Sequence, residues 1–390
     1  MLKKKSLMII FANPKDYLNI IFTARELSSN YTENHILCFE DKKKFYGKVD
    51  FGKSKVFFLE SNFFAKFYYF NLLLFFFKCF VYYVKFRPDI LIGYNSHGII
   101  ISYILSKLFK KPFLISHNFD FEKPESYKGN LRKVLFKLEL FSAGKSDLVI
   151  LPNISRANIY SRLGKIKKSK IDYMFNSYPI NFKIKNSKIL KKYLLKKKIN
   201  YKKIIIRLGH FGPHHAIENL IRSALYWKGK FILILAGHGT AEYVQQLNKL
   251  IKDLDIQDKI IIFRSVTYKF WYDILFSGDL GVCLYEEKVL SHKHMEGTSQ
   301  KLNNYLLANI PMITNNNSEF KKFNMIYKCN ILADTSSPIL IAKAINAVLI
   351  NKDYYKFLSK QSRIAFQDRI NFNYQFKRVF LDRVFINCNE

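Results

Sequence analysis

Short apolar runs alternate with amphipathic stretches along the whole chain. A strand with one solvent-exposed face would alternate apolar and polar residues, and these runs do not alternate. Continuous apolar runs are typical of strands buried on both faces of a parallel sheet. They cover residues 7–12, 35–39, 55–59, 88–93, 111–117 and 147–152 in the first half, and 203–208, 231–236, 259–263, 280–284, 311–314 and 330–333 in the second. Between most of them, apolar residues recur at helical spacing. This strand–helix–strand rhythm predicts α/β architecture with doubly wound parallel sheets.

The length and one basic segment predict two domains. A chain of 390 residues exceeds the roughly 150 residues of one average domain. Residues 182–203 are crowded with lysines and contain no acid, which favours a solvated helix or linker. We therefore expect a first domain over residues 1–180, a basic linker over 181–202 and a second domain over 203–370. Residues 371–390 are expected to form a terminal helix that crosses back to the first domain.

Residues 62–86 form the most apolar stretch of the chain, with 25 residues dominated by Phe, Tyr and Leu. A membrane span needs about 20 apolar residues, but Lys66, Asn71, Lys78 and Lys85 would place polar groups inside the bilayer. Two alternatives remain. The stretch is either a mostly buried helix beneath the sheet or a helix whose aromatic and lysine-bearing face lies among lipid headgroups.

The formal net charge of +34 indicates a phosphate-bearing partner. The heavy use of Lys, Asn, Ile, Phe and Tyr also fits an AT-rich genome. An anionic membrane surface is one expected partner, because each lysine near such a surface is attracted to it by about 1 kcal/mol. A nucleic-acid or polyanion-binding protein is the alternative, although the lysines are spread along the chain and no nucleic-acid recognition motif is present.

Cysteine spacing and the N-terminus favour a cytoplasmic protein. The five cysteines are scattered and no pair has metal-ligand spacing, which predicts free thiols in a reducing compartment. The apolar run that begins at Ser6 is short and ends at Asn13 and Pro14, so it resembles a first strand more than an export signal.

The segment 286–320 carries the clearest candidate chemistry. A charged, His-rich loop ends at Gly297 and precedes a helix with a buried stripe. Thr298 and Ser299 have hydroxyls suited to capping that helix. The free N–H groups and positive dipole of a helix N-terminus, with Lys301 beside them, form a phosphate site.

This segment resembles the donor-binding motif of GT-B glycosyltransferases of family 4, which are retaining and use nucleotide sugars. The matching positions are Ser299, Lys301, 304–308 and 310–313. Family 4 enzymes carry two glutamates separated by seven residues, and here Glu296 occupies the first position and Asn304 the second. Asn309 replaces the usual glycine.

The resemblance implies two Rossmann-like domains facing across a cleft, with acceptor on the first and donor on the second. It assigns catalytic positions to His117 and Glu296, and acceptor-binding positions to His97 and Asn118. The implied donor-binding residues are Arg207, Gly209, His210, His215, Gly237, Arg264, Ser265, Thr298, Ser299, Lys301 and Asn304.

Two of these positions depart from the family pattern. His210 and His215 stand where family 4 has an Arg and a Lys on the phosphates, and imidazole supplies a weaker, pH-dependent charge. A metal bound by these histidines is the alternative interpretation, which GT-B enzymes in general do not require.

The resemblance therefore implies a glycosyltransferase that moves a sugar from a nucleotide sugar to a carbohydrate or lipid-linked acceptor in surface glycan synthesis. The nucleotide sugar is a substrate, and no cofactor or metal is expected. The expected location is the inner face of the cell membrane. A GT-B-like nucleotide-sugar epimerase is a further alternative.

Overall fold

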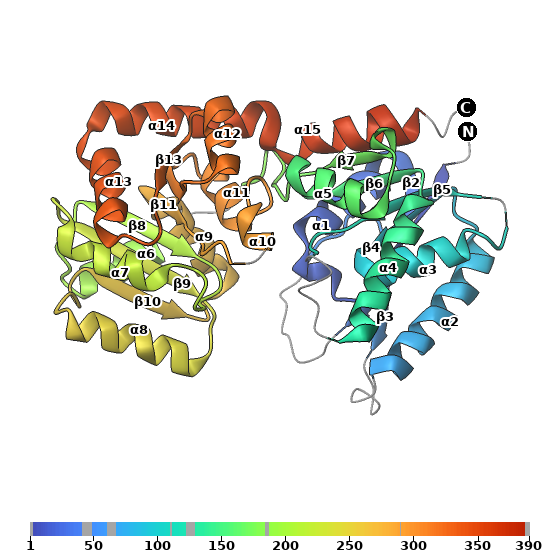
Figure 1. Cartoon of the computed structure of the whole chain (residues 1–390), viewed down its shortest axis with the longest axis horizontal. Coiled ribbons are helices and arrows are strands. Elements are labelled where there is room, and N and C mark those ends of the chain that lie inside the picture. The colour runs from blue at the N-terminus through green and yellow to red at the C-terminus, as the bar shows by residue number, and fades with distance from the viewer. Residues whose placement is uncertain are drawn as a thin grey trace. The chain divides into compact units, whose positions relative to one another are not determined.

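The computed structural model describes residues 3–40, 49–60, 68–109, 111–121, 129–183, 187–288 and 290–386. The chain divides into two compact units (Figure 1). The first unit comprises Met1–Pro179 together with Phe372–Glu390, and the second comprises Ile180–Asn371.

The first unit is built on a seven-stranded sheet in which every pairing is parallel. Its strands, in the spatial order β3-β2-β1-β4-β5-β6-β7, are β3 (Lys55–Glu60), β2 (Thr32–Glu40), β1 (Lys4–Ile10), β4 (Ile90–Tyr94), β5 (Phe113–His117), β6 (Leu148–Leu151) and β7 (Ile171–Tyr173). The helices between them are α1 (Leu18–Glu26), α2 (Tyr68–Phe86), α3 (Asn95–Leu105), α4 (Asn130–Gly144) and α5 (Ile154–Gly164).

The second unit contains a six-stranded parallel sheet in the order β10-β9-β8-β11-β12-β13. The strands are β8 (Lys203–Leu208), β9 (Phe231–Gly237), β10 (Ile260–Arg264), β11 (Leu280–Cys283), β12 (Met312–Asn315) and β13 (Asn330–Ala333). The helices are α6 (Ile189–Lys196), α7 (Ile217–Ser223), α8 (Ala241–Asp253), α9 (Tyr268–Ser277), α10 (Leu290–Lys293), α11 (Gln300–Leu307), α12 (Ser318–Tyr327), α13 (Pro338–Ile350) and α14 (Lys352–Ala365).

Both units confirm the predicted fold class of doubly wound parallel sheets. Every residue of β4 and of β9 is buried, which explains why the apolar runs are continuous. Strand order reverses between β1 and β4 in the first sheet and between β8 and β11 in the second. Open parallel sheets bind ligands at the carboxyl ends of the strands flanking such a reversal.

The lysine-rich segment expected to link the domains belongs to the second unit. Residues 180–202 all lie in that unit, and the segment forms α6, which packs on α9 through the buried Leu190 and Leu194. Asp273 of α9 accepts hydrogen bonds from the backbone N–H groups of Ser187 (3.2 Å) and Leu190 (2.7 Å). The lysines of α6 are solvated, but the helix is held by its apolar stripe and by Asp273.

The end of the chain returns to the first unit. There α15 (Phe372–Phe376) leads into a π-helical segment, Lys377–Phe385. Asp172 on β7 accepts hydrogen bonds from Arg378 and, at 2.8 Å, from Arg383. These ion pairs and the buried Phe376 and Phe380 fix the terminal segment to the unit.

Helix α2 lies within the apolar stretch 62–86, of which residues 62–67 are outside the described part of the chain. It is the one helix, among the described residues, that is long and apolar enough to cross a membrane, and 28% of that window is buried. The alternative of a mostly buried helix is therefore wrong, because α2 buries one stripe and exposes the rest.

Two glycines bring the ends of β8 and β9 together. A Cβ on Gly237 would lie 1.8 Å from the carbonyl oxygen of Gly209, so no larger residue fits there with the present backbone. Gly209 itself has φ of +111° and donates its N–H to the Ala236 carbonyl at 2.9 Å. The loops after these two strands are thus held in contact.

Replacing Asp172 by Asn tests the terminal contact. The change removes the negative charge shared by Arg378 and Arg383, and it should lower the free energy of unfolding by about 2 kcal/mol. Thermal melts of this variant should show a lower Tm than Asp382→Asn, the same change at an exposed neighbouring position. Equal melting temperatures would show that the ion pairs contribute nothing.

Replacing Gly237 by Ala tests the strand contact. Because the new methyl group meets backbone, the end of β8 must shift, and we expect a loss of about 2 kcal/mol or more in denaturant unfolding. Gly144→Ala is the control, since its Cβ would meet no atom closer than 3.8 Å. If Gly237→Ala unfolds like the control, the close approach of the two loops does not constrain the fold.

Candidate functional site

The predicted donor-binding residues gather at the carboxyl ends of β8, β9 and β11 in the second unit. Arg207 lies on β8, Gly209 follows it, and Gly237 ends β9. Lys301 lies in the first turn of α11, the helix that follows the loop after β11. These are the strands that flank the reversal of strand order, where the sheet geometry favours a ligand.

Lys301 connects α11 to the glycine loop. Its Nζ would be 3.1 Å from a Cβ on Gly209, so a side chain at that position would displace the ammonium. The ammonium donates a hydrogen bond to the Tyr285 hydroxyl at 3.0 Å, and it lies 4.9 Å from the centre of that ring. Burial, with the charge of Arg207 nearby, lowers the pKa of Lys301 to about 7.

Arg207 places a second cation in the same region. Its side chain is 1% exposed, donates one hydrogen bond to the Gly209 carbonyl at 3.2 Å, and lies 5.6 Å from the Phe211 ring centre. Its Nη2 is buried with no hydrogen-bond partner among the described residues. Neither Arg207 nor Lys301 forms an ion pair with a carboxylate in the described part of the chain. Two desolvated, uncompensated cations attract an anion.

The histidines at the two departures from the family pattern form a cluster of rings beside these cations. His210 lies 5.4 Å from His215 and 5.2 Å from His238, and His215 lies 5.3 Å from His292. Burial and the neighbouring cationic groups lower the pKa values of His210 and His215, the latter to about 2. Both imidazoles are therefore neutral near pH 7, and the positive charge comes from Arg207 and from the protonated form of Lys301.

The N-terminus of α11 differs in detail from the prediction. Ser299 is the N-cap residue, but its hydroxyl is hydrogen-bonded with the Tyr285 hydroxyl at 2.9 Å and caps no backbone N–H. The Thr298 hydroxyl donates to the Met295 carbonyl at 3.2 Å. The expected side-chain cap is therefore wrong, because the buried Tyr285 is in reach of the Ser299 hydroxyl. The first N–H groups of the helix are left without a side-chain cap from Ser299.

Asn304 and Asn303 are both completely buried in α11. The Asn303 amide donates to the Gly297 carbonyl at 2.9 Å and holds the preceding loop. Neither amide atom of Asn304 has a hydrogen-bond partner among the described residues. A buried amide without partners costs free energy, so Asn304, at the family's second glutamate position, is suited to bonding a ligand.

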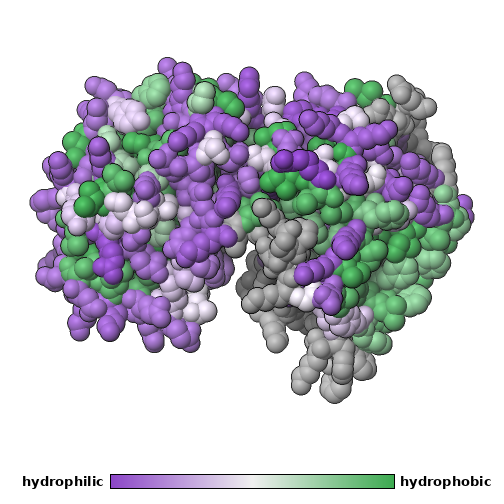
Figure 2. Space-filling model, viewed as in Figure 1, coloured by the Kyte–Doolittle hydropathy of each residue, from purple (hydrophilic) through white to green (hydrophobic). Residues whose placement is uncertain are grey.

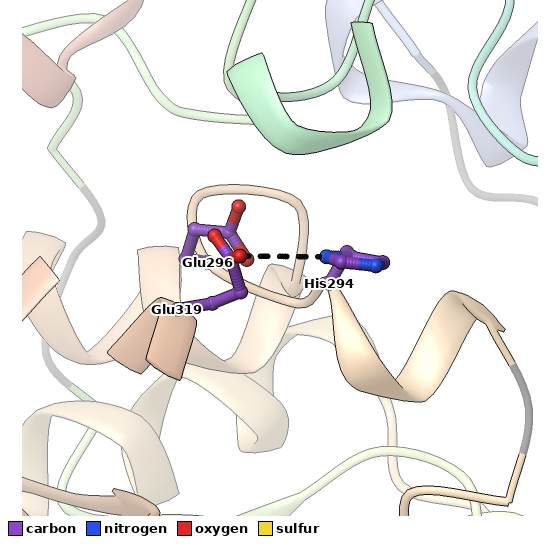
Figure 3. A group of neighbouring side chains, drawn as sticks. All are labelled: His294, Glu296 and Glu319. Atoms are coloured by element: carbon purple, nitrogen blue, oxygen red, sulfur yellow. Dashed lines mark ion pairs between the residues drawn. The ribbon is translucent and has the colours of Figure 1, made fainter. Parts of the chain in front are cut away.

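Glu296 lies beside a second carboxylate and an imidazole. Figure 3 shows the side chains of His294, Glu296 and Glu319 converging from the loop after α10 and from α12. One imidazole nitrogen of His294 and one carboxylate oxygen from each glutamate, which are atoms that could bind a metal ion, all lie within 4.8 Å of one another. His294 Nδ1 is 3.9 Å from Glu319 Oε1. Glu296 is 6% exposed. The sequence pattern did not identify His294 and Glu319 as its neighbours.

Two of the predicted donor-binding residues, Arg264 and Ser265, lie at the end of β10. Arg264 and Ser265 are exposed, and Ser265 has φ of +59°. The Ser265 N–H donates to the Gly237 carbonyl at 2.8 Å. This bond joins the loop after β10 to the contact between Gly209 and Gly237.

His117, in the first unit, ends β5 and is completely buried. Its ring lies 5.3 Å from that of Tyr94 and 4.5 Å from that of Phe119. Burial lowers its pKa to about 3, so the imidazole is neutral near pH 7. Neither ring nitrogen has a hydrogen-bond partner among the described residues. His117 lies at the predicted strand end, but aromatic rings cover it in this structure.

The other two acceptor candidates have partners within the first unit. His97 Nε2 is hydrogen-bonded with the Tyr68 hydroxyl at 2.8 Å. The Asn118 amide donates to Glu139, a residue that sequence reasoning missed. Glu139 is 1% exposed and also accepts hydrogen bonds from Ser96 and Tyr160, both at 2.5 Å. The sequence contains a signal for this residue, because Glu139 is the single acidic residue of α4, which also carries Arg132, Lys133 and Lys137.

A cavity of about 700 Å³ opens in the first unit at the amino ends of the strands, opposite the carboxyl ends that carry His117 and Asn118. Its lining includes Lys4, Asp89 and Phe113, which lie at or just before the starts of β1, β4 and β5. Ligands of open parallel sheets bind at strand ends rather than at strand starts. The cavity is therefore separate from the residues of either predicted site.

A match to a known protein family lies within the second unit, which contains the predicted donor-binding residues. Residues 191–365 match the family model described as glycosyl transferases group 1. No curated protein sequence matches the chain.

Solved structures share the fold over nearly the whole chain. Anabaena HepE in complex with UDP and glucose has 12% identity and a TM-score of 0.72, over 97% of this chain and 99% of that chain. A glycosyltransferase from Rickettsia africae has 15% identity and a TM-score of 0.74, over 100% of both chains. WaaG, a glycosyltransferase involved in lipopolysaccharide biosynthesis, has 10% identity and a TM-score of 0.67, over 96% of this chain and 99% of that chain.

At these low identities the structural likeness shows the fold alone, which is that of GT-B enzymes. The family model adds the activity class, and it covers the strand, the loop and the helix that carry Arg207, Gly209 and Lys301. The predicted resemblance is thereby confirmed: residues 191–365 are a group 1 glycosyltransferase domain, and the protein is a glycosyltransferase with the GT-B fold.

Proposed function

We propose that this glycosyltransferase takes its sugar from a nucleoside diphosphate sugar and binds the diphosphate between the β8 loop and the start of α11. The observation that carries this proposal is a pair of neighbouring cations, the buried Arg207 and the half-buried Lys301, which have no carboxylate partner among the described residues. The N–H groups at the N-terminus of α11 add the positive end of a helix dipole.

The geometry suits a leaving diphosphate. Breaking the bond from the sugar to the phosphate leaves negative charge on the nucleotide, and fixed positive groups in a site shielded from water stabilise that charge. Lys301, Arg207 and the α11 N-terminus supply such groups from the protein itself. The glycines at positions 209 and 237 allow the phosphates to approach the backbone closely.

UDP is the first nucleotide to test, because HepE, which shares the fold, has been solved with UDP and with UDP-glucose. Within the proposed site, Glu296 contacts the transferred sugar and Asn304 contacts a ribose hydroxyl. Retention of the anomeric configuration is the proposed outcome, by likeness to the group 1 family.

For the acceptor, we propose a carbohydrate or lipid-linked glycan of the cell surface, assembled at the cytoplasmic face of the membrane. The support is that WaaG and the galactosyltransferase WaaB, which share the fold, act in lipopolysaccharide synthesis. The high positive charge of the chain also fits an enzyme that works on an anionic surface.

A thermal-shift screen of the full chain against UDP, ADP, GDP and their sugars tests the donor class. A nucleotide that binds only the native state raises Tm by mass action. The nucleotide that shifts Tm is then incubated as its sugar with glycan acceptors, and the anomeric configuration of the product is read by NMR. If no nucleoside diphosphate raises Tm at millimolar concentration, the proposed donor site is wrong.

Replacing Lys301 by Ala should weaken UDP binding by about 10- to 100-fold, since it removes a charge-assisted bond of about 1.5–3 kcal/mol. Isothermal titration calorimetry measures the change, and Lys293→Ala, at an exposed lysine of α10, is the control. Unchanged affinity in Lys301→Ala would remove this residue from the site.

The pH dependence of binding follows from the same lysine. Above pH 7 the free Lys301 is largely neutral, since its pKa is about 7, and the diphosphate must restore its proton. UDP affinity should therefore fall as pH rises from 7 to 9, by up to about tenfold per unit, with proton uptake on binding. The slope should be absent in Lys301→Ala, and a slope that persists there would assign the titration to another group.

Replacing Asn304 by Leu should raise Tm and lower nucleotide affinity. The change removes two buried polar atoms that lack partners, which stabilises the free protein, and it also removes the proposed bond to the ligand. Asn303→Leu is the matched control, since it breaks the bond to Gly297 and should lower Tm. A lower Tm in Asn304→Leu would mean that this amide already has a structural partner.

A further inference from the structure

The first unit presents a broad apolar surface on three neighbouring helices, α2, α3 and α4, and the short turn after α3. Large side chains point outward from all of them. Examples are Leu73 (51% exposed) and Phe77 (55%) on α2, Phe109 (47%) after α3, and Val134 (50%), Leu138 (46%) and Phe141 (55%) on α4. We call this surface the α2–α4 face. Figure 2 shows hydrophobic residues gathered over these helices.

Helices α2 and α4 both pack against α3, so the exposed sides of the three helices are neighbours. The exposed Phe109 ring stacks 6.4 Å from the buried Tyr83 ring of α2, and the exposed Phe141 ring of α4 lies 5.7 Å from the Tyr103 ring of α3. On α4 the exposed apolar residues recur at Leu131, Val134, Leu138 and Phe141, which places them on one side of the helix. Contiguous apolar surface of this extent marks an interaction site.

Helix α2 cannot leave the unit without exposing its other side. Phe75, Cys79, Tyr83 and Phe86 form a buried stripe that packs with Leu7 and other residues of the sheet in one hydrophobic core. A transmembrane orientation would remove this stripe from the core. The helix is therefore suited to lie against an apolar medium with its outer side rather than to cross it.

Positive charge surrounds the α2–α4 face. Arg132, Lys133 and Lys137 are exposed on α4, between the apolar side chains. Arg87 lies 5.6 Å from the Phe109 ring centre and Lys145 lies 5.5 Å from that of Phe141. Among the described residues, α2 and α3 contain no acid, and the single acid of α4, Glu139, is 1% exposed.

This charge distribution decides between two occupants of the face. A second copy of the chain would bring the same arginines and lysines against each other, and like charges in contact oppose association. A bilayer with anionic headgroups offers the complement to both features, because acyl chains accept the apolar side chains and headgroups pair with the surrounding cations.

We infer that the α2–α4 face docks the first unit on an anionic lipid surface, with the aromatic and aliphatic side chains of α2 and α4 in the headgroup region. The inference concerns where the enzyme works and deepens the proposed function, since a lipid-linked acceptor is found at such a surface. It stands on the exposure and charge of this unit and does not require that the donor be known.

Co-sedimentation of the full chain with vesicles tests the inference. Vesicles of phosphatidylcholine containing phosphatidylglycerol should bind the protein, and pure phosphatidylcholine vesicles should bind it far less. The triple variant Leu73→Asp, Phe77→Asp and Leu138→Asp should lose binding to the anionic vesicles by about tenfold or more. A second variant, Arg132→Glu with Lys133→Glu and Lys137→Glu, should lose it by about tenfold while keeping the apolar side chains.

Matched controls keep the test decisive. Met325→Asp, Ile326→Asp and Ile339→Asp make the same three charge changes at apolar residues of the second unit that are 77%, 62% and 56% exposed, and should leave vesicle binding unchanged. The Tm shift with UDP, measured on every variant, reports the donor site separately. Full vesicle binding by both face variants would overturn the inference, and so would a dimer of the wild type that dissociates to monomer in the triple variant.

Discussion

The second unit depends on a contact between a lysine and a glycine. Lys301 reaches from α11 to the backbone of Gly209, where a Cβ would be only 3.1 Å from the ammonium. Gly209 in turn lies so close to Gly237 that a Cβ on Gly237 would be 1.8 Å from the Gly209 carbonyl oxygen, which leaves no room for a larger residue at the end of β9. Removing water from Lys301 and Arg207 together costs free energy that the described residues do not offset with a carboxylate. An anionic ligand is the natural source of the missing interaction.

The same constraint explains the unusual residues of the site. An imidazole in place of an Arg or a Lys loses charge, and His210 and His215 are neutral near pH 7 because burial and nearby cations lower their pKa values. Arg207 lies two residues before Gly209 and has its guanidinium on the Gly209 carbonyl. Arg207 thereby supplies positive charge beside the glycine loop, where the two histidines are neutral.

The two units carry different kinds of chemistry on the same scaffold. In the second, polar and charged groups converge at the carboxyl ends of the strands. In the first, the strand ends hold His117 among aromatic rings and Asn118 on Glu139, while the outer sides of α2 and α4 are apolar and ringed by cations. Recognition of an anionic nucleotide and attraction to an anionic surface thus depend on separate groups of residues, which substitutions can test independently.

The sequence by itself determined both parallel sheets, because strands buried on two faces require continuous apolar runs such as those of β4 and β9, and it placed Lys301 at the start of a helix through the spacing after Gly297. Only the tertiary structure decided that Ser299 bonds to Tyr285 instead of capping α11, that α6 belongs to the second unit through Leu190, Leu194 and Asp273, and that α2 buries only one stripe of its side chains. The local pattern of apolar and polar residues indicates whether a segment is a helix or a strand. The hydrogen-bond partner of a hydroxyl and the buried side of a helix depend instead on residues that are distant in sequence.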